Sequence, residues 1–127
     1  MTTPTKIEYN ATISFRKDLR RLLKKYKTLE EDLETVKRDA IELYHLKCKD
    51  NQSVFPIQGF YTEEIRVCKI KKFACKALKG RGSKSGMRII YAFHCQIYKV
   101  DFIEIYFKGD KENEDRERIK EYLSGFF

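Results

Sequence analysis

The segment Met87-Arg-Ile-Ile-Tyr-Ala-Phe-His94 decides the fold class of this chain. Its β-branched and aromatic residues favour an extended strand. Alternate side chains of a strand point to opposite faces, which here hold Arg88, Ile90, Ala92 and His94 on one side and Met87, Ile89, Tyr91 and Phe93 on the other. Both faces are largely apolar, so we expect this strand to lie in the centre of a sheet.

Two more segments of similar composition flank this strand along the chain, Ile65–Phe73 and Val100–Phe107. A long connection rich in Gly, Lys and Ser precedes the central strand and a short one follows it, as is typical of an antiparallel meander. We therefore predict a small antiparallel sheet over about residues 65–107. Residues 48–64, which contain Pro56 and Gly59, predict a loop.

The N-terminal part of the chain predicts a strand followed by a helical hairpin. Apolar residues alternate with polar ones over residues 7–13, which favours a short first strand or an extended lead-in. Helical spacing then continues over about residues 14–46. Ser14 is the expected N-cap of the first helix, and Thr28 with Glu31 has the form of a capping box that opens the second.

A closing helix is predicted over about residues 114–124, where Ile119, Tyr122 and Leu123 have helical spacing. The resulting fold class is α+β: an N-terminal strand and helical hairpin packed on a small antiparallel sheet, with a C-terminal helix. A length of 127 residues suits one domain spanning residues 1–127.

The composition and the apolar runs of the chain indicate in which cellular compartment to expect the protein. The 42% of hydrophobic residues, with 8 Tyr and 9 Phe, argues against disorder. No apolar run approaches the roughly 20 residues of a membrane-spanning helix, and the N-terminus lacks the apolar core of a signal peptide. We therefore expect a cytoplasmic protein without a membrane partner. Its four cysteines are expected as free thiols, and their spacing predicts neither a metal site nor a cofactor.

Positive charge is concentrated in the middle of the chain. The net charge is +8, and residues 66–88 hold nine basic residues with no Asp or Glu. Such one-sided charge repels itself and is typical of a surface that binds a polyanion. A solvated basic face that binds nothing is the alternative.

Common catalytic motifs are missing from the sequence. Residues 79–86, KGRGSKSG, lack the spacing of a phosphate-binding P-loop, and neither a nucleophile elbow nor a metalloprotease motif is present. His45 and His94 have no neighbouring partner in sequence, which favours structural roles. The clustered Lys and Arg residues remain as the candidates for chemistry.

Three segments of the C-terminal half carry a family resemblance: Cys68-Lys-Ile-Lys71, the run Lys79–Phe93, and Ile103-Glu-Ile-Tyr-Phe-Lys-Gly-Asp-Lys-Glu-Asn-Glu114. Together they resemble the toxins of the RelE/HigB group within the RelE/ParE superfamily. The resemblance implies a metal-independent, ribosome-dependent mRNA endoribonuclease that inhibits translation as the toxin of a type II toxin–antitoxin pair. Its expected partners are a cognate antitoxin, the ribosome and mRNA, and its oligomeric state is left open.

The resemblance also implies a set of catalytic residues, which are Lys69, Lys71, Arg88, Lys108 and Lys111. Our hypothesis is that the first three clamp the scissile phosphate while Lys108 or Lys111 transfers protons. The cations expected to bind the RNA backbone are Arg66, Lys76, Lys79, Arg81 and Lys84. Some members have a catalytic Tyr early in the last helix, where this chain reads Glu114-Asp115-Arg116, so lysines would take that role.

Two other functions suit the same residues. A ParE-like relative would inhibit DNA gyrase without cleaving RNA, because one fold can serve several functions. A non-enzymatic nucleic-acid-binding module would use the cations for phosphates and the interleaved aromatic residues for bases. An inactive toxin is a further alternative.

Overall fold

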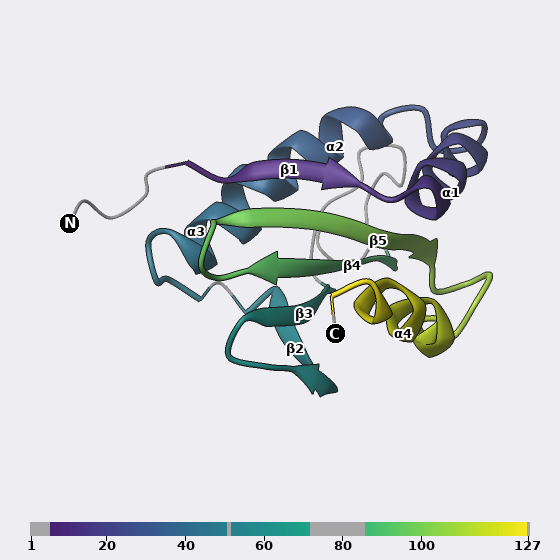
Figure 1. The fold of residues 1–127 in the computed structure, drawn as a ribbon. Helices are drawn as coiled ribbons and strands as arrows, with labels where there is room; N and C mark the ends of the chain where they lie inside the picture. Colours follow the sequence, from purple (N-terminus) through teal and green to yellow (C-terminus); the bar gives the residue numbers. More distant parts are fainter. Residues whose placement is uncertain (1–5, 51, 72–85, 127) are drawn as a thin grey trace.

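A five-stranded sheet forms the middle of the molecule, with strands in the order β1-β5-β4-β3-β2 (Figure 1). The computed structural model describes residues 6–50, 52–71 and 86–126. The strands are β1 (Glu8–Ala11), β2 (Val54–Tyr61), β3 (Ile65–Ile70), β4 (Met87–His94) and β5 (Lys99–Phe107). Strands β2 to β5 pair antiparallel, whereas β1 pairs parallel to β5, so the first strand adds a parallel edge to the predicted meander.

Strand β4 is the middle strand, as its apolar composition predicts, and it has the predicted bounds. It pairs with β3 on one side and with β5 on the other. In the pairing with β5, Ile90 lies opposite Glu104 whereas Tyr91 lies opposite Phe102, so β5 contains one extra residue. Such a bulge changes the alternation of side chains along a strand.

The prediction of a loop over residues 48–64 is wrong for residues 54–61, which form strand β2. This strand lies at the edge of the sheet, where a proline does not interrupt a ladder on both sides. Its register with β3 shifts between Pro56 and Tyr61, and Gly59 has a φ of 92°. The Pro and Gly that suggested a loop therefore mark an irregular edge strand instead.

The predicted helical hairpin is present. It comprises α1 (Ile13–Leu23), α2 (Leu29–Val36), a π-helical segment η1 (Lys37–Glu42) and α3 (Leu43–His45), and the C-terminal helix is α4 (Arg116–Ser124). Within the described ranges, none of the helices has the length and apolar character that a bilayer-spanning segment needs.

The predicted N-cap of the first helix is wrong, whereas Thr28 is the N-cap of α2 as predicted but makes no side-chain cap hydrogen bond. The N-cap of α1 is Thr12, not Ser14, and its hydroxyl oxygen accepts a hydrogen bond from the amide of Phe15 at 3.1 Å. Thr28 has a φ of −91° and a ψ of 3°, away from the extended conformation of a side-chain cap. Its hydroxyl instead donates to the carboxylate of Asp32 at 2.8 Å.

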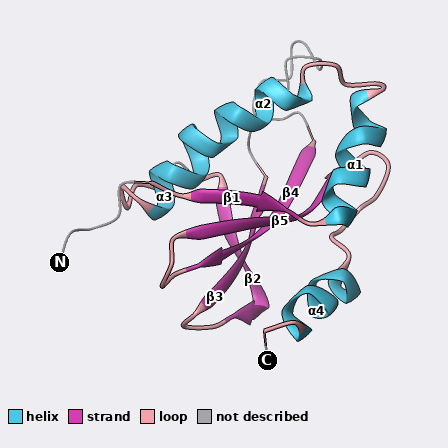
Figure 2. Cartoon of the chain, turned by 45° about the horizontal axis from the view of Figure 1, so that its top comes forward, coloured by secondary structure: helices cyan, strands magenta, loops and turns pink. Residues whose placement is uncertain are grey.

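The helices lie on opposite sides of the sheet, with α1 and α2 on one side and α4 on the other (Figure 2). We call these sides the hairpin face and the α4 face. The larger apolar core lies on the hairpin face and includes Phe15, Leu29, Ile41, Ile89, Phe102 and Ile105. The smaller core lies on the α4 face and includes Val67, Ile90, Ala92, Ile103 and Ile119.

Candidate nucleic-acid interface

A pocket of about 200 Å³ opens on the α4 face, where β2, β3 and the start of α4 meet. Its charged lining residues are Lys69, Lys71, Glu114 and Arg116. Three of these four side chains are cationic, so the pocket suits an anionic group.

Lys69 and Lys71 point to the same side because they are two residues apart at the end of β3. Lys69 lies opposite Ile90 of β4, which belongs to the core of the α4 face. The two lysines predicted from sequence to act together are therefore brought together by the structure.

Glu114 occupies the pocket as the counterion of these cations. Its carboxylate forms an ion pair with Lys69, and both side chains are largely buried, at 11% and 15% exposure. The guanidinium of Arg116 lies 3.7 Å from the same carboxylate. Although burial alone would raise the pKa of Glu114, the hydrogen bond and charge of Lys69, together with the charge of Arg116, hold it below its ordinary value.

Arg88 lies beside this group at the start of β4. Its Nη1 donates to the backbone oxygen of Lys71 at 3.0 Å and to that of Met87 at 3.1 Å. These bonds fix the guanidinium at the end of β3, next to the predicted phosphate-binding lysines. Arg88 therefore lies next to Lys71, and its role as a phosphate clamp stays a prediction.

Tyr106 is a member of this face that the sequence prediction missed. It lies opposite Arg88 in the register of β4 and β5, and its side chain is only 4% exposed. Its hydroxyl has no hydrogen-bond partner within the described residues. Burial, together with the negative charges of Glu114 and Glu104, raises the pKa of Tyr106 to about 12. The hydroxyl therefore keeps its proton at neutral pH and can donate a hydrogen bond.

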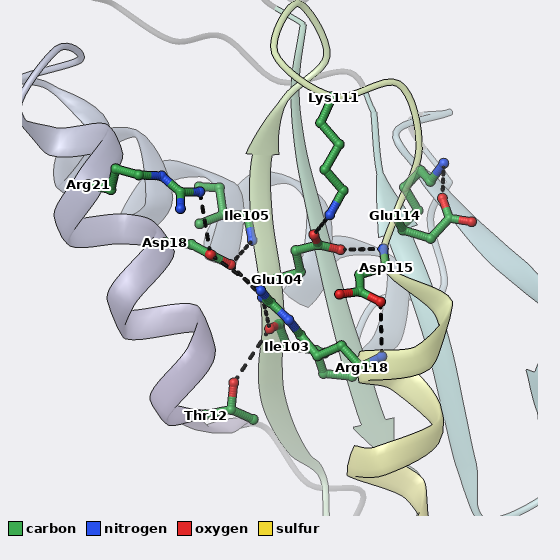
Figure 3. A network of polar contacts seen from close by, with 11 residues as sticks. Thr12, Asp18, Arg21, Ile103, Glu104, Ile105, Lys111, Glu114, Asp115 and Arg118 are labelled. Carbon is green, nitrogen blue, oxygen red and sulfur yellow. Dashed lines mark hydrogen bonds and ion pairs between the residues drawn. The ribbon is translucent and has the colours of Figure 1, made fainter.

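Lys111 and Glu104 form an ion pair next to Tyr106, in which the carboxylate is buried and the lysine side chain is 39% exposed. Glu104 is 2% exposed and also accepts a hydrogen bond from the amide of Asp115 at 2.8 Å (Figure 3). The ammonium of Lys111 lies 5.3 Å from the centre of the Tyr106 ring. Glu104 lies directly opposite Ile90 at the bulge of β5, and its carboxylate holds both Lys111 and the start of α4.

A further ion pair fixes α4 to helix α1 of the opposite layer. Arg118 of α4 donates to Asp18 of α1 at 2.6 Å, and it also donates to the backbone oxygen of Ile103 (Figure 3). Burial disfavours the charge of Arg118, but its hydrogen bond to Asp18 outweighs this and raises its pKa. Asp18 in turn accepts a hydrogen bond from the amide of Ile105, which lies in a part of β5 beyond its pairing with the short strand β1. This network positions the start of α4, and with it Glu114, beside the pocket.

The other predicted residues are not brought together with this group. Lys108 is exposed and does not line the pocket. Arg66 has the opposite parity to Lys69 on β3, and its guanidinium lies over Tyr61, 5.2 Å from the ring centre. The predicted RNA-binding residues Lys76, Lys79, Arg81 and Lys84 lie outside the described residues.

His94 does have partners, at the far end of the α4 face. Its Nε2 lies 2.6 Å from the hydroxyl of Tyr122 and 3.2 Å from the carboxylate of Asp101. Phe126 packs on the same ring, with centroids 5.0 Å apart. This cluster anchors the end of α4 to the sheet, in agreement with the structural role predicted for His94.

Comparison with known proteins gives matches in structure. No family model and no curated protein sequence matches the chain. The solution structure of a conserved hypothetical protein from Helicobacter pylori is similar, with a TM-score of 0.50, 16% identity, and coverage of 83% of this chain and 98% of that one. The RelE–RelB complex from Pyrococcus horikoshii OT3 gives a TM-score of 0.48, 15% identity, and coverage of 81% and 96%.

The chain shares the fold of the Helicobacter pylori protein. The α+β arrangement predicted from the sequence, with a helical hairpin and a C-terminal helix around a small sheet, is confirmed. At these identities the likeness concerns the fold alone, because unrelated functions share small α+β folds.

Proposed function

We propose that this protein is the toxin of a toxin–antitoxin pair and cleaves mRNA on the ribosome with the cations of its α4 face. The observation that carries the proposal is the convergence of Lys69, Lys71 and Arg88 beside one pocket. The match to a RelE chain solved with RelB supports an antitoxin as the partner of this chain as well.

The cations of this face suit the charge that develops in RNA cleavage. When the 2′-hydroxyl attacks the neighbouring phosphate, negative charge accumulates on the phosphate oxygens, and placed donors stabilise it. Lys71 and Arg88 supply these donors. Tyr106 lies opposite Arg88 in the strand pairing, and because its hydroxyl is buried we assign it no contact with the phosphate.

We assign proton transfer to Glu114 and Lys111, one residue from each of the ion pairs Lys69–Glu114 and Lys111–Glu104. A phosphate that enters the pocket competes with Glu114 for Lys69, because both are anions. Once displaced, Glu114 loses the contact that lowers its pKa and becomes the better acceptor for the proton of the 2′-hydroxyl. Lys111 then gives a proton to the leaving 5′-oxygen. Lys108 stays a predicted contributor outside the pocket.

The test is mRNA cleavage on translating ribosomes. Lys71→Ala and Arg88→Ala should each reduce cleavage by about 100-fold, the typical effect of removing one charge-stabilising donor. Lys111→Ala should also reduce it, while Lys120→Ala, an exposed α4 lysine paired with Glu117, is the matched control. Full activity in the first three variants would refute the proposed site.

A gyrase assay separates the main alternative function. If the wild type blocks DNA supercoiling and leaves mRNA intact, the chain acts like a ParE relative. Binding of RNA without any cleavage product, on or off the ribosome, would instead indicate a non-enzymatic module.

A further inference from the structure

Phe55 is an aromatic residue of the pocket that belongs to neither apolar core of the described residues. Its side chain is half-buried on edge strand β2. An aromatic ring that leaves part of its surface open on a basic face is a typical stacking platform for bases.

The register of the sheet places this ring among the phosphate-binding cations. Phe55 lies opposite Lys69 in the pairing of β2 with β3, so the two side chains share the α4 face. The ammonium of Lys71 lies 4.9 Å from the centre of the Phe55 ring. A phosphate bound by Lys71 would therefore have its neighbouring base within reach of the ring.

The other aromatic residues of β2 differ from Phe55. Phe60 is 8% exposed and belongs to the core of the α4 face, so its ring has a packing role. Tyr61 is 43% exposed and lies under the guanidinium of Arg66, but it does not line the pocket. Phe55 alone among these three rings lines the pocket and is absent from the two cores.

We propose that Phe55 stacks against a nucleobase of the bound RNA, next to the phosphate held by Lys71. The inference rests on the proposed function and adds a base-binding subsite to it. Stacking requires only the flat face of a base, so Phe55 contributes affinity and positioning for any base. Gln58, whose side chain is exposed in the same pocket, offers both a donor and an acceptor to a base edge.

The experiment measures binding of the full chain to a short 2′-O-methyl RNA, which has no free 2′-hydroxyl and is not cleaved. Phe55→Leu should weaken binding about ten-fold, whereas Phe55→Trp should retain or improve it. Tyr61→Leu is the matched control, since it removes a neighbouring exposed ring of β2 outside the pocket, and it should bind like the wild type.

Abasic substitutions identify the stacked base. Replacing one nucleotide at a time by an abasic one should weaken wild-type binding about ten-fold at one position, and this effect should be absent in Phe55→Leu. Equal sensitivity of both proteins at every position would overturn the inference. If Phe55→Leu does not fold, the abasic series is measured with the wild type and Phe55→Trp. RNA binding that is unaffected by an abasic nucleotide at every position in both proteins would overturn the inference.

Lys71→Ala distinguishes failure of the subsite from failure of the proposed function. If Lys71→Ala weakens binding while Phe55→Leu does not, the phosphate site stands and the stacking role is refuted. If the wild type does not bind the RNA, or if neither variant differs from it, both the site and its base subsite are refuted.

Discussion

The two faces of the sheet differ in their apolar packing and in their charged side chains. On the hairpin face, large apolar side chains from α1, α2, η1 and the four strands β2 to β5 pack together, and most are fully buried. On the α4 face, a smaller core is bordered by the ion pairs of Lys69 with Glu114 and of Lys111 with Glu104. Such ion pairs, whether buried or partly exposed, add little net stability in comparison with apolar packing. The hairpin face therefore contributes more apolar packing to the fold, and the α4 face is the one to which we assign the proposed RNA site.

The largest expected effect is the loss of packing on the hairpin face. Ile89 and Arg88 are neighbours on β4 and point to opposite faces, and Ile89 is fully buried. Ile89→Ala should lower the free energy of unfolding by about 2–5 kcal/mol, because it leaves a cavity in the larger core. Urea denaturation measures this, with Arg88→Ala as the neighbouring control that should change stability much less. Equal losses in the free energy of unfolding of the two variants would contradict this difference between the two faces.

A pH effect on stability is the next largest. His45 packs on Phe93 on the hairpin face, and burial together with the charge of Arg66 lowers its pKa from 6.5 to about 4. The folded state therefore binds fewer protons than the unfolded state between these values, so stability is present above pH 6.5 and is lost as the pH falls toward 4. Since part of the ring is open to solvent, we expect a loss of about 1–2 kcal/mol.

Thermal unfolding between pH 7 and pH 4 measures this effect. His45→Phe removes the titrating group and should make the lower part of the stability profile flatter than that of the wild type. An unchanged pH profile in this variant would show that His45 is not the group that titrates.

The smallest expected effect sharpens the view of the α4 face. Glu114→Gln removes the negative charge beside Lys69 and leaves one more cation free for RNA. Binding of the 2′-O-methyl RNA should become about three-fold tighter, and its dependence on salt should become steeper by about one phosphate contact. Cleavage should nevertheless fall, because the proposed proton acceptor is lost.

Glu117→Gln is the control for net charge. It removes the same charge from an exposed position of α4, where Glu117 pairs with Lys120 at 3.2 Å. If both variants change binding equally, the effect of Glu114 is long-range attraction and not release of a cation in the pocket.

Much of the fold could be predicted because the apolar periodicity that marks each helix or strand lies within a short stretch of sequence. Strand β4 has the predicted bounds, since apolar residues on both of its faces distinguish it from a helix or an edge strand. Strand β2 was missed because Pro56 and Gly59 interrupt an edge strand whose hydrogen bonds are irregular. The N-cap at Ser14 and the side-chain cap bond of Thr28 were not found, because cap geometry depends on backbone angles that the residue types do not determine.

The grouping of the candidate residues could be predicted in part, for a related reason. Alternation along β3 and pairing with β4 bring Lys69, Lys71 and Arg88 together, and both follow from the strand pattern. Tyr106 and Glu104 could not be assigned, because in sequence they are part of an apolar strand and the β5 bulge sets the register of Glu104. The sequence signal for Glu104 was a carboxylate within an otherwise apolar strand segment.

The central claim is that RNA binds the α4 face, and amide chemical shifts of the labelled protein titrated with the 2′-O-methyl RNA test it most directly. We predict that the amides of Phe55, Lys69, Lys71 and Arg88 shift, while those of α2 do not. Shifts confined to α1 and α2, with the pocket residues unchanged, would contradict the account.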